Sequence, residues 1–276
     1  MSEVGERRLR IGAVNYLNSK PLVEGLGVDA TGAELLFDYP SHLADRLAEG
    51  DLDAALIPSV EYLRNDEYRI VSDACVATRG PVLSVKLYGR CRFSEVRSLA
   101  LDEGSRTSVV LARILLSERY GVSPTLVTLP IGQQLQECRA DAILVIGDRA
   151  IPAPQESFVE IWDLGQEWTQ WTGLPFVFAL WAARPETDLD RLQSILIRAR
   201  DLGVSCLEDI ARRESSVLGI DHTTADSYLT DNLHFRLGSA ERDGLRLFYE
   251  LASKQGLVPK GKEIVFRHCT PAGQGR

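Results

Sequence analysis

Short apolar runs alternate with segments of helical periodicity along the first two thirds of the chain. The runs at Leu9–Val14 and 54–57 have the composition of buried strands, and the segment 41–50 between them has leucines at helical spacing. Strands that alternate with helices are typical of βαβ units and favour an α/β fold. Beyond residue 185 the pattern is helical, over 189–212, 224–232 and 240–254.

The alternation of strands and helices occurs twice, which indicates two lobes. The second series opens with a strand at 99–101 and a helix at Thr107–Tyr120. We expect the chain to cross between the lobes near residue 89 and to return near residue 183. Lobe 1 then comprises residues 1–88 and 184–276, with the C-terminal helices packed on it, and lobe 2 comprises residues 89–183.

The chain has 276 residues, of which 45% are hydrophobic and 25% are charged, an ordinary composition for a globular protein. Its 31 Lys and Arg residues against 39 Asp and Glu residues give a net charge of −8. This balance argues against a nucleic-acid partner, which usually needs a basic face, and against a polybasic membrane surface. No apolar run approaches the length of about 18 residues that a membrane span requires. The oligomeric state stays open.

The five cysteines, Cys75, Cys91, Cys138, Cys206 and Cys269, are far apart and never form a CxxC pair. That spacing indicates neither a disulfide framework nor a zinc site, and a reducing compartment fits it best. The N-terminal segment MSEVGERRLRIGAV contains neither the apolar core nor the cleavage site of a secretory signal. We therefore expect a cytoplasmic protein.

Ligands of open α/β sheets bind beyond the carboxyl ends of the strands, at the starts of helices. Four loops occupy such positions, at 15–20, 58–61, 103–108 and 146–150. In EGSRTS, at 103–108, Gly104 permits tight backbone geometry, and three hydroxyl side chains lie at the start of a helix, where free N–H groups favour an anion. Capping of the helix by one of these hydroxyls is the more common use of such residues.

Polar side chains follow the first strand, in NYLNSK. The amides of Asn15 and Asn18 both donate and accept, so either can orient a hydroxyl or a carboxylate without adding charge. Hydrogen bonding within the turn is the commoner use of Asn, and Lys20 fits a solvated lysine. Ser84, in RGPVLS, can face either a cleft or solvent, and Asp148 can act as a base or as a cap.

Motifs for cofactor and metal chemistry are missing from the sequence. The GxxxxGK[ST] P-loop, the G-x-G-x-x-G fingerprint and the GxSxG elbow do not occur. The histidines have no metal-ligand spacing; they are His42, His222, His234 and His268. We expect neither a cofactor nor a metal ion.

Six segments, in order, resemble the chorismate dehydratases of the futalosine route to menaquinone. They are RIGAVNYLNSKPL at the start, GDLDAALIPSVEYL at 50–63, RGPVLSVKL at 79–87, SRTSVVLARILL at 105–116, DAILVIGDRA at 141–150 and TGLPFVFALWAARP at 172–185. The C-terminal helices fit the resemblance more loosely. The resemblance implies a type II periplasmic-binding-protein fold, with two α/β lobes, a double hinge and a cleft, which agrees with the two lobes expected above.

The resemblance also implies an activity. A hydro-lyase of this family removes water from the small dicarboxylate chorismate and forms 3-[(1-carboxyvinyl)oxy]benzoate. The elimination removes the ring proton beside the enolpyruvyl ether and expels the neighbouring hydroxyl. Because aromatisation of the ring drives this step, the reaction requires no redox cofactor or metal.

The candidate loops offer no histidine as a base. We hypothesise that the enolpyruvyl carboxylate of the substrate takes the proton, while Asn18 orients that carboxylate and Ser84 binds the departing hydroxyl or the carboxylate. Such positioning alone can contribute about 7–11 kcal/mol to catalysis. Further substrate contacts are expected from Asn15, Tyr16, Ser59, Ser105, Arg106, Thr107, Ser108, Gly147 and Asp148.

Two other functions fit the same fold. One is 1,4-dihydroxy-6-naphthoate synthase of the same pathway, although NYLNSKPL and SRTSVVL fit the dehydratase better. The other is a binding protein that holds a small carboxylate without changing it, because a fold does not determine a function. The lack of a secretory signal weighs against a transport role.

Overall fold

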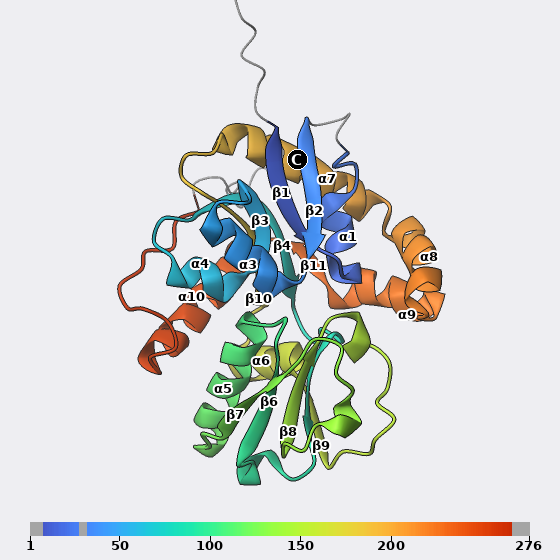
Figure 1. Ribbon diagram of the computed structural model, residues 1–276, viewed down its shortest axis with the longest axis vertical. Helices are drawn as coiled ribbons and strands as arrows, with labels where there is room; N and C mark the ends of the chain where they lie inside the picture. Colours follow the sequence, from blue (N-terminus) through green and yellow to red (C-terminus); the bar gives the residue numbers. More distant parts are fainter. Residues whose placement is uncertain (1–7, 28–31, 267–276) are drawn as a thin grey trace, which may run out of the picture.

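The computed structural model describes residues 8–27 and 32–266 and contains two β-sheets, one in each of two lobes (Figure 1). The first sheet has the strand order β11-β4-β10-β3-β1-β2 and the second has the order β7-β6-β8-β5-β9. The strands of the first sheet are β1 (Leu9–Val14), β2 (Ala33–Asp38), β3 (Ala54–Pro58), β4 (Arg69–Thr78), β10 (Phe176–Ala183) and β11 (His234–Arg236). Those of the second are β5 (Val85–Gly89), β6 (Ser98–Asp102), β7 (Thr125–Leu129), β8 (Ala142–Ile146) and β9 (Glu160–Asp163).

The central strands are apolar because helices or loops cover both of their faces. Every residue of β3 (AALIP) and of β8 (AILVI) is buried, as expected of central strands in a sheet that is covered on both faces. β3 pairs in parallel with β1, and β8 pairs in parallel with β6. The loops after these strands therefore meet at one edge of each sheet.

The helices follow the predicted pattern with local differences. They are α1 (Lys20–Val23), α3 (Pro40–Glu49), α4 (Ser59–Arg64), α5 (Thr107–Tyr120), α6 (Leu164–Thr172), α7 (Leu189–Ser205), α8 (Leu207–Leu218), α9 (His222–Ser227) and α10 (Ser239–Lys254). Short turns of 3₁₀-helix are η1 (Leu17–Ser19), η2 (Phe93–Glu95), η3 (Leu135–Glu137) and η4 (Asp148–Ala150), and η5 (Tyr228–Asn232) is a π-helical turn. The helix expected over 189–212 is divided at Cys206, whose extended φ of −131° ends α7.

The chain passes between the sheets at different points from those expected. β5 lies in the second sheet, between β8 and β9, and β10 lies in the first sheet, between β3 and β4; all four pairings are antiparallel. The crossings therefore fall at 79–84 and 173–175, instead of near residues 89 and 183. An apolar run such as β5 or β10 fits either sheet, so its composition does not reveal which sheet it joins.

Helices from the C-terminal third pack on the first lobe, as expected. α7 packs against α1 and β4, and α10 packs against β10 (Figure 1). One continuous cluster of buried apolar side chains includes residues of both lobes, so the lobes are in contact. No helix in the described residues is both long and apolar enough to span a membrane.

The described cysteines, Cys75, Cys91, Cys138 and Cys206, are free thiols. Cys269, His268 and the first seven residues of the N-terminal segment lie outside the described residues.

Candidate active site

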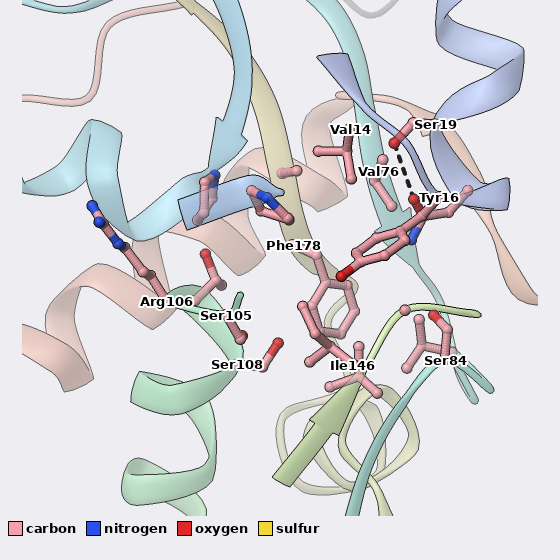
Figure 2. A pocket seen from close by; sticks show the side chains of 18 residues that line it. Val14, Tyr16, Ser19, Val76, Ser84, Ser105, Arg106, Ser108, Ile146 and Phe178 are labelled. Carbon is pink, nitrogen blue, oxygen red and sulfur yellow. Dashed lines mark hydrogen bonds between the residues drawn. The ribbon is translucent and has the colours of Figure 1, made fainter. Parts of the chain in front are cut away.

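A cavity lies between the lobes, where the loops that follow β1, β3, β6 and β8 face one another (Figure 2). The cavity has a volume of about 60 Å³ in this structure, which is room for a few water molecules. Much of its wall is apolar, formed by Val14, Pro40, Pro58, Val76, Val82, Val85, Ile146, Phe178 and Ala179. A wall of this kind excludes water and strengthens the few polar contacts inside it.

Most of the predicted site residues line this cavity. They are Tyr16, Asn18, Ser84, Ser105, Arg106, Thr107, Ser108 and Gly147. Tyr16 and Asn18 follow β1, Ser84 precedes β5, the residues at 105–108 start α5, and Gly147 follows β8. Two lobes and one crossing segment thus contribute to the same site.

Three predicted residues do not line the cavity. Asn15 is exposed and its side-chain oxygen accepts a hydrogen bond from Lys20 Nζ at 3.1 Å. Ser59 is fully buried, and its hydroxyl donates to the carbonyl of Val177 at 2.7 Å, so it fastens α4 to β10. Asp148 instead joins the two lobes through a backbone contact.

The carboxylate of Asp148 in η4 accepts hydrogen bonds from the backbone N–H of Leu17, at 3.0 and 3.3 Å. Leu17 begins η1 in the first lobe, so this contact crosses from one lobe to the other. Burial raises the pKa of Asp148 to about 6, against the lowering effect of the Leu17 N–H and of Lys20. The Asp148 carboxylate therefore caps the start of η1 from the other lobe. Of the two roles that the sequence allowed for Asp148, a base or a cap, its contacts fit the cap.

Arg106 lies at the mouth of the cavity, with its guanidinium turned away from the interior (Figure 2). It donates to both carboxylate oxygens of Asp45 at 2.7 Å and to Glu61 at 3.1 Å. Both acids belong to the first lobe, on α3 and α4. The positive charge is thus already neutralised by two carboxylates, and the prediction that Arg106 binds substrate finds no support in its side-chain contacts.

The start of α5 faces the cavity with unused backbone donors. Within the described chain, no side chain caps this helix. The hydroxyl of Thr107, which lies in its first turn, instead accepts from the N–H of Val60 at 3.2 Å, across the lobes. Ser105 and Ser108 are nearly buried beside it. Free N–H groups and hydroxyls at a helix start form an environment that favours a carboxylate.

Asn18 and Ser84 are held by their neighbours. Ser19 donates to the side-chain oxygen of Asn18 at 3.1 Å (Figure 2). Ser84 is fully buried, and its hydroxyl accepts from the hydroxyl of Tyr228 at 2.7 Å. Tyr228 begins the π-helical turn η5 and was not predicted to belong to the site. Its place in a helical segment more than 140 residues away from Ser84 offered no local signal.

Tyr16 and Gly147 bring the two lobes into van der Waals contact. Gly147 has a φ of +76°, and a Cβ at this position would lie 2.6 Å from the ring of Tyr16. Only glycine lets the ring approach so closely at this backbone geometry. Burial raises the pKa of Tyr16, so its hydroxyl stays protonated.

Metal-ligating side chains do not gather anywhere in the described part of the chain, where no group of three or more His, Cys, Asp or Glu residues has the arrangement of a metal site. The histidines His42, His222 and His234 do not line the cavity.

Comparisons with known proteins agree with this architecture. A family model for menaquinone biosynthesis matches residues 9–254. The chain is similar to a chorismate dehydratase from Thermus thermophilus, with 33% identity over 258 residues that cover 87% of this chain and 93% of that protein.

Solved structures also resemble this chain. A protein from Archaeoglobus fulgidus has a TM-score of 0.76 and 15% identity, covering 92% of this chain and 100% of that one. The periplasmic aliphatic sulphonate binding protein SsuA from Escherichia coli has a TM-score of 0.60 and 15% identity, covering 94% and 96%. These likenesses confirm the expected periplasmic-binding-protein fold.

Proposed function

The chain belongs to the menaquinone biosynthesis family, and we propose that it is a chorismate dehydratase, a hydro-lyase that converts chorismate to 3-[(1-carboxyvinyl)oxy]benzoate. Similarity to the dehydratase from Thermus thermophilus over most of both chains supports this activity. The sequence motifs that resemble the enzymes of the futalosine route support the same pathway and a cytoplasmic location, which are parts of this proposal.

One observation about the cavity carries the mechanism. Among the described residues that line it, no carboxylate, imidazole or amine is present, and Arg106, the charged side chain at its mouth, is paired with Asp45 and Glu61. A protein base is therefore missing from the site. The enolpyruvyl carboxylate of chorismate lies within its own molecule and supplies the base, if the site holds the reactive conformer.

The neutral donors of the site suit that task. Asn18, from the first lobe, orients the enolpyruvyl carboxylate, and Ser84, from the crossing segment, donates to the departing hydroxyl. The ring carboxylate is held at the start of α5, near Ser105 and Ser108, by backbone N–H groups. The proton beside the ether passes to the substrate carboxylate, the C–O bond breaks with its electron pair on the departing oxygen, and the carboxyl group returns the proton to that oxygen, so that water leaves as the ring becomes aromatic. No electrons leave the substrate, so the step needs no redox cofactor.

The closed lobes contribute by excluding water. Asp148 and Arg106 join the lobes on two sides of the cavity, and its wall is largely apolar. Removal of water strengthens the hydrogen bonds from Asn18 and Ser84. The closed lobes also hold the enolpyruvyl group in the reactive conformer, which is the main catalytic contribution we assign to the protein.

Mixing the purified protein with chorismate, and following the products by liquid chromatography and mass spectrometry, tests the activity. We expect protein-dependent loss of the mass of one water with formation of an aromatic enolpyruvyl ether, unchanged after dialysis against a chelator. Chorismate that is bound and recovered intact would indicate a binding protein. Chorismate that is neither bound nor changed would direct the assay to the naphthoate-forming reaction.

Variants test the mechanism separately from the activity. We expect Asn18→Ala to lower kcat by about 10² to 10³ with a small change in KM, as for loss of a donor that acts in the transition state. Ser84→Ala should behave similarly. Asp148→Asn is the matched control, since it removes a carboxylate near the cleft that lies outside the cavity. A larger loss from Asp148→Asn than from Asn18→Ala would contradict the substrate-base mechanism.

A further inference from the structure

Ser84 has a defined hydrogen-bond direction. Its hydroxyl accepts from the hydroxyl of Tyr228 at 2.7 Å, and both residues are fully buried. A serine hydroxyl has one proton and two lone pairs, so an occupied lone pair leaves the proton for another partner. Ser84 lines the cavity, so a ligand bound there is the partner we expect for this proton.

Tyr228 also lies next to Asn18, another polar residue of the cavity. Its pKa is raised by burial and lowered by hydrogen bonds with Ser84 and with the side chain of Asn18. The side-chain oxygen of Asn18 accepts from Ser19 at 3.1 Å. The hydroxyl of Tyr228 donates to Ser84, and Asn18 lies close enough to affect the pKa of that hydroxyl.

The turn that contains Tyr228 is bound to the crossing segment at more than one point. Asn232, at the other end of η5, donates from its side chain to the carbonyl of Pro81 at 3.0 Å. The carbonyl of Asn232 accepts from the hydroxyl of Thr78 at 2.9 Å. A π-helical turn is uncommon and often occurs at functional sites, because it inserts a residue and redirects a side chain. Here it keeps Tyr228 beside Ser84 while holding the segment from which Ser84 projects.

We propose that Tyr228 is a positioning residue, which donates to Ser84 and so directs the proton of Ser84 into the cavity. This inference rests on the proposed dehydratase function and extends its site to the C-terminal helices. Ser84 thereby meets the departing hydroxyl of the substrate as a donor. Tyr228 itself does not touch the substrate, and it loses no proton in the reaction.

Tyr228→Phe removes the hydroxyl and keeps the ring. We expect kcat to fall about tenfold or more, as for loss of one buried hydrogen bond that orients a reacting group, while KM changes little. The double variant Tyr228→Phe with Ser84→Ala should be no slower than Ser84→Ala alone, because both changes remove the same contact. Independent, multiplying losses would overturn the proposal, and so would a wild-type kcat for Tyr228→Phe.

Tyr62→Phe is the matched control. Tyr62 is also buried, and its hydroxyl accepts from the N–H of Val265 at 3.3 Å, outside the cavity. We expect this variant to keep kcat and KM, with at most a small loss of melting temperature. Equal losses of kcat in both variants would indicate a general effect of buried tyrosine hydroxyls and would overturn a specific role for Tyr228.

Replacement of Tyr228 by 3,5-difluorotyrosine provides a second measurement that keeps the packing. Fluorination lowers the pKa of the phenol, so the fall of kcat at alkaline pH should move to lower pH. If the tyrosine were merely structural, the pH dependence of kcat would not change, and that result would overturn the proposal. If wild-type protein leaves chorismate unchanged, the dehydratase function fails and this inference with it. If wild type converts chorismate and the variants match it, only the role of Tyr228 fails.

Discussion

The guanidinium of Arg106, at the start of α5 in the second lobe, donates two hydrogen bonds of 2.7 Å to the carboxylate of Asp45 on α3 of the first lobe. Glu61 accepts a third bond at 3.1 Å. On another side of the cavity, Asp148 of the second lobe accepts from Leu17 of the first. These contacts join the two lobes, and we expect them to oppose opening of the cleft.

Removal of the Arg106 charge should weaken lobe closure. We expect Arg106→Gln to raise KM about threefold to tenfold, because a bidentate but partly exposed ion pair contributes on the order of 1 kcal/mol. The wild-type KM should rise with salt, which screens this pair, and the KM of the variant should depend less on salt. Small-angle scattering with bound product should show a less compact variant. Arg212→Gln is the control, since Arg212 pairs with Glu208 on the exposed face of α8; an equal effect there would contradict the prediction.

Gly147 should be intolerant of any side chain. We expect Gly147→Ala to lower kcat/KM by about 10² or more, because its Cβ would meet the ring of Tyr16 at 2.6 Å and hold the lobes apart. Gly121→Ala is a close control: Gly121 has a φ of +66°, and nothing lies within 4 Å of a Cβ there. Gly121→Ala should lose about 1 kcal/mol of stability from its left-handed backbone, and Gly147→Ala about 1–3 kcal/mol, because its ψ of −164° lies in a region nearly restricted to glycine. If Gly121→Ala loses activity equally, the contact with Tyr16 is not the cause.

Asp148 should make folding less favourable as pH rises through its pKa. Its pKa is about 6 in the folded protein and about 4 in an unfolded chain, so the folded state binds the proton more tightly. The contribution of this group to stability is therefore fully present below pH 4 and is lost as pH rises to about 6. Asp148→Asn keeps an acceptor for Leu17 and removes the buried charge.

We expect Asp148→Asn to be more stable than wild type at pH 8, by at most about 3 kcal/mol. The difference should disappear as pH falls from 6 to 4. Denaturant unfolding of the two proteins across that range measures this difference directly. A variant that is less stable at pH 8, or a difference that does not depend on pH, would contradict the assignment.

The sequence predicted the parts of the fold and site that depend on local pattern. The fully apolar runs at β3 and β8 predicted buried strands, and the loops after strands predicted where ligands bind. Asn18 and the hydroxyls at the start of α5 lie in such loops, whereas Ser84 precedes a strand and was assigned a role only through the family resemblance; the structure brings all of them to one cavity. In each case the sequence pattern that predicts the feature lies within a few residues of it.

Features that depend on distant contacts could not be predicted. The direction of Arg106 is set by Asp45 and Glu61, which belong to another lobe. Tyr228 is placed at the site by a π-helical turn, and the residues next to it in the sequence have the pattern of an ordinary helix. β5 and β10 are apolar runs whose sheet depends on antiparallel partners far along the chain. Local periodicity contains none of this information.

The backbone before Ser84 is strained and is held by one carboxylate. Leu83 has a φ of +63°, a left-handed conformation that costs a leucine about 1–2 kcal/mol. Asp163 stabilises it, because its carboxylate accepts from the N–H groups of Val82 at 2.9 Å and Leu83 at 2.7 Å. The same carboxylate caps α6 through two further N–H groups. We therefore expect the bonds to Asp163 to hold the turn that places Ser84 at the cavity.

We expect Asp163→Asn to destabilise the protein by about 2–3 kcal/mol, because the amide NH₂ would face a backbone donor that the carboxylate had satisfied. Turnover should fall at least as far as in Ser84→Ala, since Leu83 would relax and carry Ser84 away from Tyr228. Asp221→Asn is the control: Asp221 caps α9 at an exposed position through Thr223 and Thr224. Melting temperatures and kcat of both variants separate the two effects. If Asp163→Asn loses stability as expected and keeps the wild-type kcat, the strained turn at Leu83 serves folding alone and Ser84 is positioned by Tyr228 without it.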